Sequence, residues 1–277
     1  MHPLRRVLIP ALTCGLFLSA FATLPAAARD QARNQADVVQ AAILPGWQQA
    51  DGSRMAALRV DLAPRWKTYW RAPGDAGIPP SFDWSASDNL RAVRYHWPRP
   101  IVIDTNGMRT IGYHDQLVLP IEIVPLDPAL PVILRGRVDI GVCKDICVPA
   151  ELDVAARLEG RGTEDRVIRG ALDNRPASAR EAGLSGISCK VAPIRDGLHL
   201  SAELTLPQLG ARETVVFESG PGIWVDESRT MRQGNRLLAE ADMISDDREP
   251  FALNRAGLTV TVISDGHAVE IQGCPAP

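Results

Sequence analysis

The chain has 277 residues, of which 45% are hydrophobic, so it is large enough for one large domain or two ordinary ones with well-filled cores. Its formal charge is −3 and no stretch forms a basic stripe, which argues against a nucleic-acid partner.

The N-terminal residues have the pattern of a cleaved signal peptide. Arg5 and Arg6 precede an apolar run over residues 7–24, and three alanines at 26–28 offer a small-residue cleavage site. No later segment approaches the roughly 18 uninterrupted apolar residues of a spanning helix. We therefore expect residues 1–28 to be a signal peptide and the mature chain to be exported. In a bacterium that compartment is the periplasm, where disulfides persist.

Short alternating runs separated by turn residues fill the next part of the chain, residues 29–162. Strands are predicted over residues 38–44, 55–62, 65–71, 82–84, 93–98, 117–123 and 132–140. The Asp51-Gly52 pair predicts a hairpin turn, and residues 73–80 and 104–108 predict loops. Many short strands at close spacing predict an antiparallel β-sandwich.

The pattern changes over residues 163–183, where a short helix at 164–172 is predicted, opened by Thr163. Strand signals resume in residues 184–277. They lie at residues 198–204, 215–218 and 258–263, with Asp-Gly turn signals at 196–197 and 265–266. We therefore predict an all-β protein of two sandwich domains, residues 29–162 and 184–277, joined by a partly helical linker.

Four cysteines remain outside the signal peptide, Cys143, Cys147, Cys189 and Cys274, and they allow three pairings. A Cys143–Cys147 bridge closes five residues and is worth about 2 kcal/mol in the chain-entropy model, whereas a Cys189–Cys274 bridge closes 86 residues and is worth about 4.6 kcal/mol. The long bridge therefore suits a structural role in the second domain. The short one restrains little and suits thiol–disulfide exchange, with a static staple as the alternative.

Three segments carry a resemblance to a known family: WKTYWRAPGD at residues 66–75, GYHDQLVLP at 112–120 and CKDICVP at 143–149. Together they resemble the N-terminal periplasmic domain of the thiol:disulfide interchange protein DsbD and its ScsB-like relatives, over residues 38–155. The resemblance implies an immunoglobulin-like sandwich and a protein-disulfide reductase that needs no cofactor. It also implies that Cys147 attacks the partner disulfide and that Cys143 resolves the mixed disulfide.

The partners that the resemblance implies are a membrane-embedded electron donor of the DsbD/CcdA/ScsB type and periplasmic substrate proteins that contain disulfides. Cytochrome c maturation and copper tolerance are processes in which such relays act. The pair departs from DsbD in its closer spacing. The membrane helices and thioredoxin-like domain of the full transporter are also missing from this sequence, so we expect the donor to be a separate protein.

The family also shields its cysteines with a loop, which by position corresponds to residues 104–111, with Met108 as the apolar lid. An ordinary hairpin loop is the alternative. Tyr69 matches an aromatic residue beside the family's pair, with plain core packing as its alternative. Lys144 and Asp145 lie between the cysteines, where the lysine favours a thiolate and the aspartate opposes it.

A rival interpretation is a non-catalytic binding module, for copper(I) or for a redox partner, with a structural Cys143–Cys147 bridge. His96, His114 and Met108 are soft or borderline ligands that suit copper(I) together with two thiols. Their spacing matches no known ligand motif, so we predict no metal site.

Overall fold

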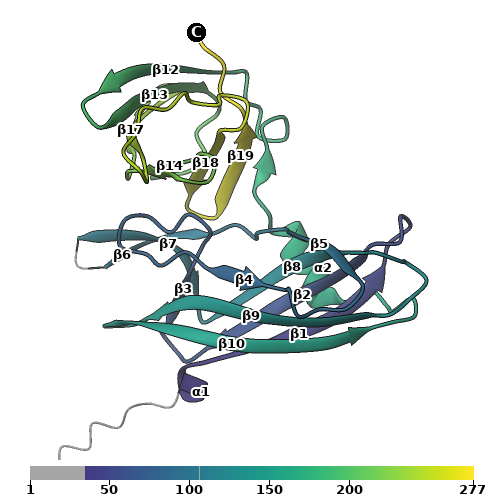
Figure 1. The fold of residues 1–277 in the computed structure, drawn as a ribbon. Helices are drawn as coiled ribbons and strands as arrows, with labels where there is room; N and C mark the ends of the chain where they lie inside the picture. The colour runs from purple at the N-terminus through teal and green to yellow at the C-terminus, as the bar shows by residue number, and fades with distance from the viewer. Residues whose placement is uncertain (1–34, 106) are drawn as a thin grey trace, which may run out of the picture. The chain divides into compact units, whose positions relative to one another are not determined.

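Strands make up most of the computed structural model, which describes residues 35–105 and 107–277 (Figure 1). The predicted signal peptide, residues 1–28, lies outside the described residues. Within them, no helix is both long enough and apolar enough to cross a membrane.

The first half of the described chain forms two antiparallel sheets that follow a single helical turn, α1 (Gln35–Val38). Sheet A has the order β1 (Val39–Gln48), β2 (Arg54–Leu62), β8 (Gln116–Pro125), β5 (Leu90–Tyr95). Sheet B has the order β10 (Cys147–Leu158), β9 (Val132–Cys143), β3 (Lys67–Tyr69), β7 (Met108–His114), β6 (Ile101–Thr105), with β4 (Ser81–Asp83) also paired to β9. The apolar faces of the two sheets share one core, which includes Leu58, Trp70, Leu119 and Val138.

Helix α2 (Arg166–Asp173) covers the other side of sheet A. Its Ile168 is fully buried against Met55 and Ala57 of β2, which explains why β2 is buried on both faces. The predicted helix exists, but Thr163 as its cap is wrong. Asp165 directly precedes the first turn, and its carboxylate accepts hydrogen bonds from the backbone N–H groups of residues 167 and 168, at 2.7 and 3.1 Å.

The second half of the chain forms two further sheets. Sheet C has the order β11 (Ala177–Ser178), β19 (His267–Gln272), β18 (Thr259–Ser264), β14 (Glu213–Glu218). Sheet D has the order β12 (Gly186–Ile194), β13 (Gly197–Thr205), β17 (Arg236–Ser245), β15 (Ile223–Val225), with β16 (Arg229–Gln233) also paired to β17. All of these pairings are antiparallel except β11–β19. The predicted all-β, immunoglobulin-like fold is therefore confirmed.

A disulfide joins Cys189 of β12 to Cys274, two residues beyond the end of β19. Both cysteines are almost completely buried in the hydrophobic core that sheets C and D form. Because β12 belongs to sheet D and β19 to sheet C, the bridge ties the two sheets together where the chain ends.

One predicted loop proves to be regular structure. Asp104 and Thr105 end β6 and Met108 begins β7, and Thr105 pairs with Met108 across the hairpin. Gly107 has φ +82° in the turn, a left-handed conformation that glycine adopts without steric cost. Asn106 lies outside the described residues.

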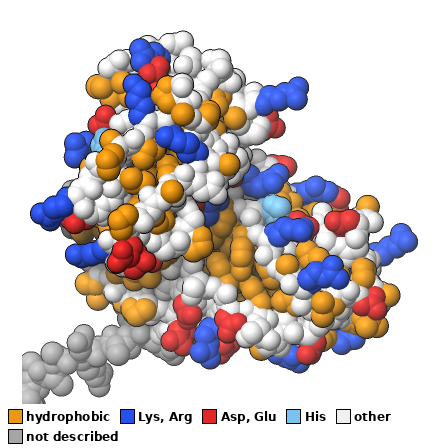
Figure 2. Space-filling view, turned by 45° about the horizontal axis from the view of Figure 1, so that its top comes forward, with side chains coloured by type: hydrophobic (Ala, Val, Ile, Leu, Met, Phe, Trp, Pro, Cys, Tyr) orange, Lys and Arg blue, Asp and Glu red, His pale blue; other side chains and the backbone are white. Residues whose placement is uncertain are grey.

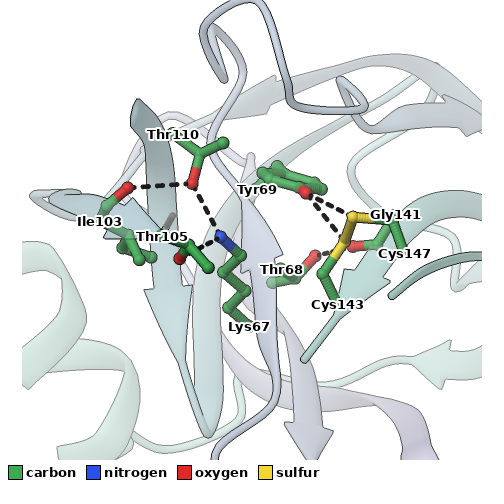
Figure 3. The surroundings of a disulfide bond; sticks show 9 residues. All are labelled: Lys67, Thr68, Tyr69, Ile103, Thr105, Thr110, Gly141, Cys143 and Cys147. Carbon is green, nitrogen blue, oxygen red and sulfur yellow. Dashed lines mark hydrogen bonds between the residues drawn. A yellow bond between two sulfur atoms is a disulfide. The ribbon is translucent and has the colours of Figure 1, made fainter. Parts of the chain in front are cut away.

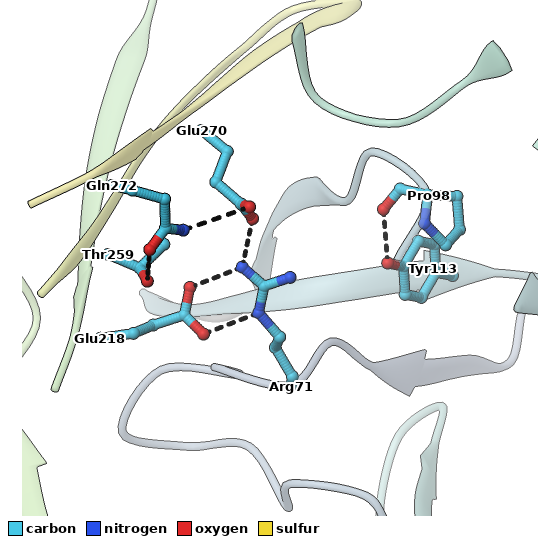
Figure 4. A network of polar contacts seen from close by, with 7 residues as sticks. All are labelled: Arg71, Pro98, Tyr113, Glu218, Thr259, Glu270 and Gln272. Atoms are coloured by element: carbon cyan, nitrogen blue, oxygen red, sulfur yellow. Dashed lines mark hydrogen bonds and ion pairs between the residues drawn. The ribbon is translucent and has the colours of Figure 1, made fainter. Parts of the chain in front are cut away.

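The two pairs of sheets contact each other through charged and apolar groups. Arg71, which follows β3, donates to Glu218 of β14 through Nε at 2.7 Å and to Glu270 of β19 at 2.5 Å (Figure 4). Ile263 and Ala268 of sheet C join the core of the first two sheets. Residues 35–277 are part of one compact unit. The division into domains 29–162 and 184–277 stays a prediction.

On the face shown in Figure 2, basic and acidic side chains are interspersed with apolar ones. Charges of both signs at close spacing partly cancel, so this face carries no extended field of one sign.

Replacing Cys274 by Ala should lower the free energy of unfolding by about 2–5 kcal/mol, because the bridge that closes 86 residues no longer restrains the unfolded chain. The measurement is denaturant unfolding of the oxidised protein. A chain with both Cys143 and Cys147 replaced by Ala is the matched control and should lose only about 2 kcal/mol. An unchanged unfolding midpoint for Cys274→Ala would show that the long bridge does not stabilise the fold.

Candidate functional site

The two close cysteines form a disulfide at the turn end of a β-hairpin. Cys143 is the last residue of β9 and Cys147 the first of β10, and the register of the two strands pairs them directly. The turn between them is Lys144-Asp145-Ile146, in which the Lys144 N–H donates to the Ile146 carbonyl at 3.2 Å. The register of the two strands thus places the two cysteines opposite each other.

The two sulfur-bearing residues differ sharply in exposure. Cys143 is 1% exposed, whereas Cys147 and the turn residues Asp145 and Ile146 lie on the surface. Cys147 is therefore accessible from solvent, whereas Cys143 is not. The sulfur of Cys143 is left to act from inside the protein.

Tyr69 of β3 lies directly against the disulfide. Its hydroxyl is 2.8 Å from the Cys143 sulfur and 3.1 Å from the Cys147 sulfur (Figure 3). The ring is 1% exposed, and this burial raises the pKa of the phenol. The hydroxyl consequently keeps its proton at neutral pH and can donate it in a hydrogen bond to either sulfur.

Gly141 makes room for this tyrosine. A Cβ atom at position 141 would lie 2.9 Å from Cε2 of Tyr69 and 2.8 Å from Cβ of Ile78. The Gly141 carbonyl also accepts from the Thr68 hydroxyl at 2.9 Å, which fixes β3 beside the end of β9. A glycine at this point of β9 is therefore what allows the Tyr69 ring to lie beside the sulfurs.

Lys67 is a site residue to which the sequence analysis assigned no role. It pairs in register with Cys143 on one side and His114 on the other. Only 7% of the residue is exposed, and burial lowers the pKa of its ammonium group. Its Nζ donates to Thr110 Oγ1 at 3.0 Å and to Thr105 Oγ1 at 3.4 Å (Figure 3). Lys67 precedes Tyr69 by two residues on one strand, and alternate residues of a strand share a face. This spacing is the sequence feature that could have placed Lys67 at the site.

The other predicted site residues lie farther from the sulfurs or on the surface. Lys144 and Asp145 form the turn between the cysteines. Met108 begins β7 and is 55% exposed. By register, His114 at the opposite end of β7 is level with Lys67 and Cys143. The shielding role of residues 104–111 stays a prediction.

The set considered for copper does not converge in the fold. His96 follows β5 of sheet A, where its Nε2 lies 3.4 Å from Glu122, whereas the disulfide is in sheet B. Among the described residues, no three His, Cys, Asp or Glu side chains gather as a metal site would need.

Comparison with known families agrees with this geometry. Residues 39–158, less than half of the chain, match the family model described as thiol:disulfide interchange protein DsbD, N-terminal. This segment is a DsbD-type N-terminal domain. The DsbD-type domain begins with β1 and ends with β10, so it contains both strands of the cysteine hairpin.

A solved structure extends the likeness beyond the DsbD-type domain. The crystal structure of the N-terminal periplasmic domain of ScsB from Proteus mirabilis superposes with a TM-score of 0.61 at 24% identity, and covers 86% of this chain and 92% of that one. This share exceeds residues 39–158, so the shared fold continues into sheets C and D. No curated protein matches the chain.

Replacing Tyr69 by Phe removes the hydroxyl and keeps the ring on Gly141. A hydrogen bond to a charged group is worth about 1.5–3 kcal/mol, so the thiol pKa of the reduced pair should rise by about one to two units. Alkylation of Cys147 at pH 7 should slow several-fold, measured by site-resolved mass spectrometry between pH 5 and 9. Superimposable pH profiles for wild type and variant would rule out a role for the hydroxyl.

If Met108 shields the pair, Met108→Gly should speed alkylation of the reduced cysteines and change stability little, because an exposed side chain buries little area. Met231→Gly is the matched control, since Met231 is also 55% exposed but lies on β16. Equal rates for wild type and Met108→Gly would exclude the shield.

Proposed function

We propose that this protein is a thiol:disulfide interchange protein that relays two electrons through the Cys143–Cys147 pair. The observation that carries the proposal is the arrangement of the pair itself: one exposed and one buried sulfur, held opposite each other by strand register, with the Tyr69 hydroxyl against both. A staple closing five residues adds little stability, so exchange is the better reason for such a pair.

The reaction starts with reduction of the pair by a donor dithiol. A donor thiolate attacks the exposed Cys147 sulfur, the bond to Cys143 breaks, and Cys143 leaves as a thiolate that accepts a hydrogen bond from Tyr69. The donor's second thiolate then attacks the donor sulfur that is bonded to Cys147 in the mixed disulfide. Cys147 is released as a thiolate, the donor is oxidised to a disulfide, and this chain holds both electrons.

The second half of the reaction passes these electrons to a substrate. The Cys147 thiolate attacks a substrate disulfide and forms a mixed disulfide, and one substrate sulfur leaves as a thiolate. Cys143 then attacks Cys147, the Cys143–Cys147 bond reforms, and the substrate is released as a dithiol. On the family likeness, the donor is a membrane-embedded transporter, the substrates are periplasmic proteins with disulfides, and the chain works in the periplasm as a protein-disulfide reductase.

Replacing Cys143 by Ala should trap the partner, because the mixed disulfide at Cys147 then has no resolving thiol. The measurement is a nonreducing gel of the exported protein, followed by mass spectrometry of the bands that dithiothreitol removes. Cys147→Ala is the matched control and should trap far less, since its remaining thiol is buried. Equal trapping by the two variants would contradict the assigned order of the cysteines.

The rival interpretation, a static bridge in a binding module, differs in its reduction potential. A structural disulfide lies below about −300 mV, and a relay lies well above this value. Equilibration with glutathione should open Cys143–Cys147 and leave Cys189–Cys274 closed. If both bridges open at the same potential, the pair is no relay.

A further inference from the structure

We propose that Lys67 is a positioning residue of the redox pair: acting through Tyr69, its charge stabilises the thiolate that forms when the Cys143–Cys147 bond is opened. The inference rests on the proposed exchange function and adds a residue and a charge to it.

Lys67 lies within sheet B, on the strand next to the one that carries Cys143. It lies between Cys143 and His114 on neighbouring strands and shares a face of β3 with Tyr69. Its Nζ is 5.9 Å from the centroid of the Tyr69 ring, and the hydroxyl of that ring contacts both sulfurs. The ammonium, the aromatic ring and the sulfurs therefore form a continuous series across the sheet (Figure 3).

The ammonium group of Lys67 has no counter-charge in the part of the chain that the structure describes. Among the described residues, no carboxylate lies within ion-pair distance of Lys67, and its Nζ donates hydrogen bonds to two threonine hydroxyls. Arg71, four residues later in the sequence, differs from Lys67 in that it forms ion pairs with two glutamates. A buried cation without an anion is costly, and this structure shows the pair oxidised, when neither sulfur carries charge.

Reduction supplies the missing anion. When two electrons enter the pair, the S–S bond breaks and one sulfur takes up a proton while the other remains a thiolate at neutral pH. The site then carries one negative charge beside a buried positive one. Tyr69 donates its hydroxyl proton in a hydrogen bond to the thiolate, and the ammonium beside the ring stabilises the same charge. Lys67 therefore favours the reduced form over the oxidised form.

Other titratable groups face the pair from the surrounding elements. His114 lies level with Lys67 on β7, and Lys144 and Asp145 form the turn between the cysteines. His114 and Asp145 are exposed and Lys144 is half-buried, so water and salt screen their effect more strongly than that of the buried Lys67. This difference provides a control.

The test replaces Lys67 by Gln, which keeps a hydrogen-bonding group near Thr110 and removes the charge. In the reduced full-length protein, the pH at which Cys147 becomes half-reactive toward iodoacetamide should rise, and its rate at pH 7 should fall by about three- to tenfold. The equilibrium constant for reduction by glutathione should fall by a similar factor. Lys67→Arg should retain the wild-type profile, which a purely packing role does not predict.

Lys190→Gln, an exposed change in sheet D, is the matched control and should alter nothing, whereas Lys144→Gln should have an effect that disappears at high salt. Lys67→Met serves as a second charge-free variant if the Gln variant unfolds, since methionine fills a similar volume without a charge. Unchanged pH profiles and potentials in a folded charge-free variant would overturn the role of Lys67. Failure of the wild-type pair to exchange with any thiol would instead overturn the proposed function itself.

Discussion

The direct pairing of Cys143 with Cys147 across the β9–β10 hairpin is the constraint on which the rest of the site depends. Both strands run for 12 residues and pair along their whole length, so the position of the two sulfurs is set by backbone hydrogen bonds far from the turn. In the proposed exchange the pair therefore opens and closes on a backbone that the sheet already fixes. What changes with the redox state is then local: the charge on the sulfurs and the hydrogen bonds of the groups that face them.

Strand β3 supplies most of those groups through simple alternation. Lys67 and Tyr69 lie on the same face of β3, where Tyr69 contacts the sulfurs, while Trp66 and Trp70 lie in the core between sheets A and B. Alternation alone does not bury the face of sheet B that points away from this core. The end of β9 is buried on both sides, because the Tyr69 ring and Ile78 lie over Gly141. A protected sulfur next to an exposed one is thus a product of packing at one end of a sheet.

How much of this the sequence predicts depends on the range of the interactions. The cysteine strand and the early hairpin at Asp51-Gly52 were predicted because alternation and turn residues are local signals. The sequence also predicts the helix, but it predicts a cap two residues too early. Thr163 and Asp165 are both suitable cap residues, and the packing of the helix decides which of them caps it. The hydroxyl contact of Tyr69 with both sulfurs and the unpaired charge of Lys67 depend on partners more than 35 residues away in sequence. No local pattern contains them.

The segment at residues 66–75 also connects the redox site to the second half of the chain. Two residues beyond Tyr69, the Arg71 guanidinium stacks on Trp70 at 4.5 Å and binds Glu218 and Glu270. Farther along, burial and the neighbouring carboxyl of Asp226 raise the pKa of Asp75 to about 6. One end of this segment therefore contacts the sulfurs, and the other end is held by charged groups of sheets C and D. Because Tyr69 can approach the sulfurs only if β3 stays in register, sheets C and D support the geometry of the proposed exchange site although none of their side chains contacts the sulfurs in a hydrogen bond among the described residues.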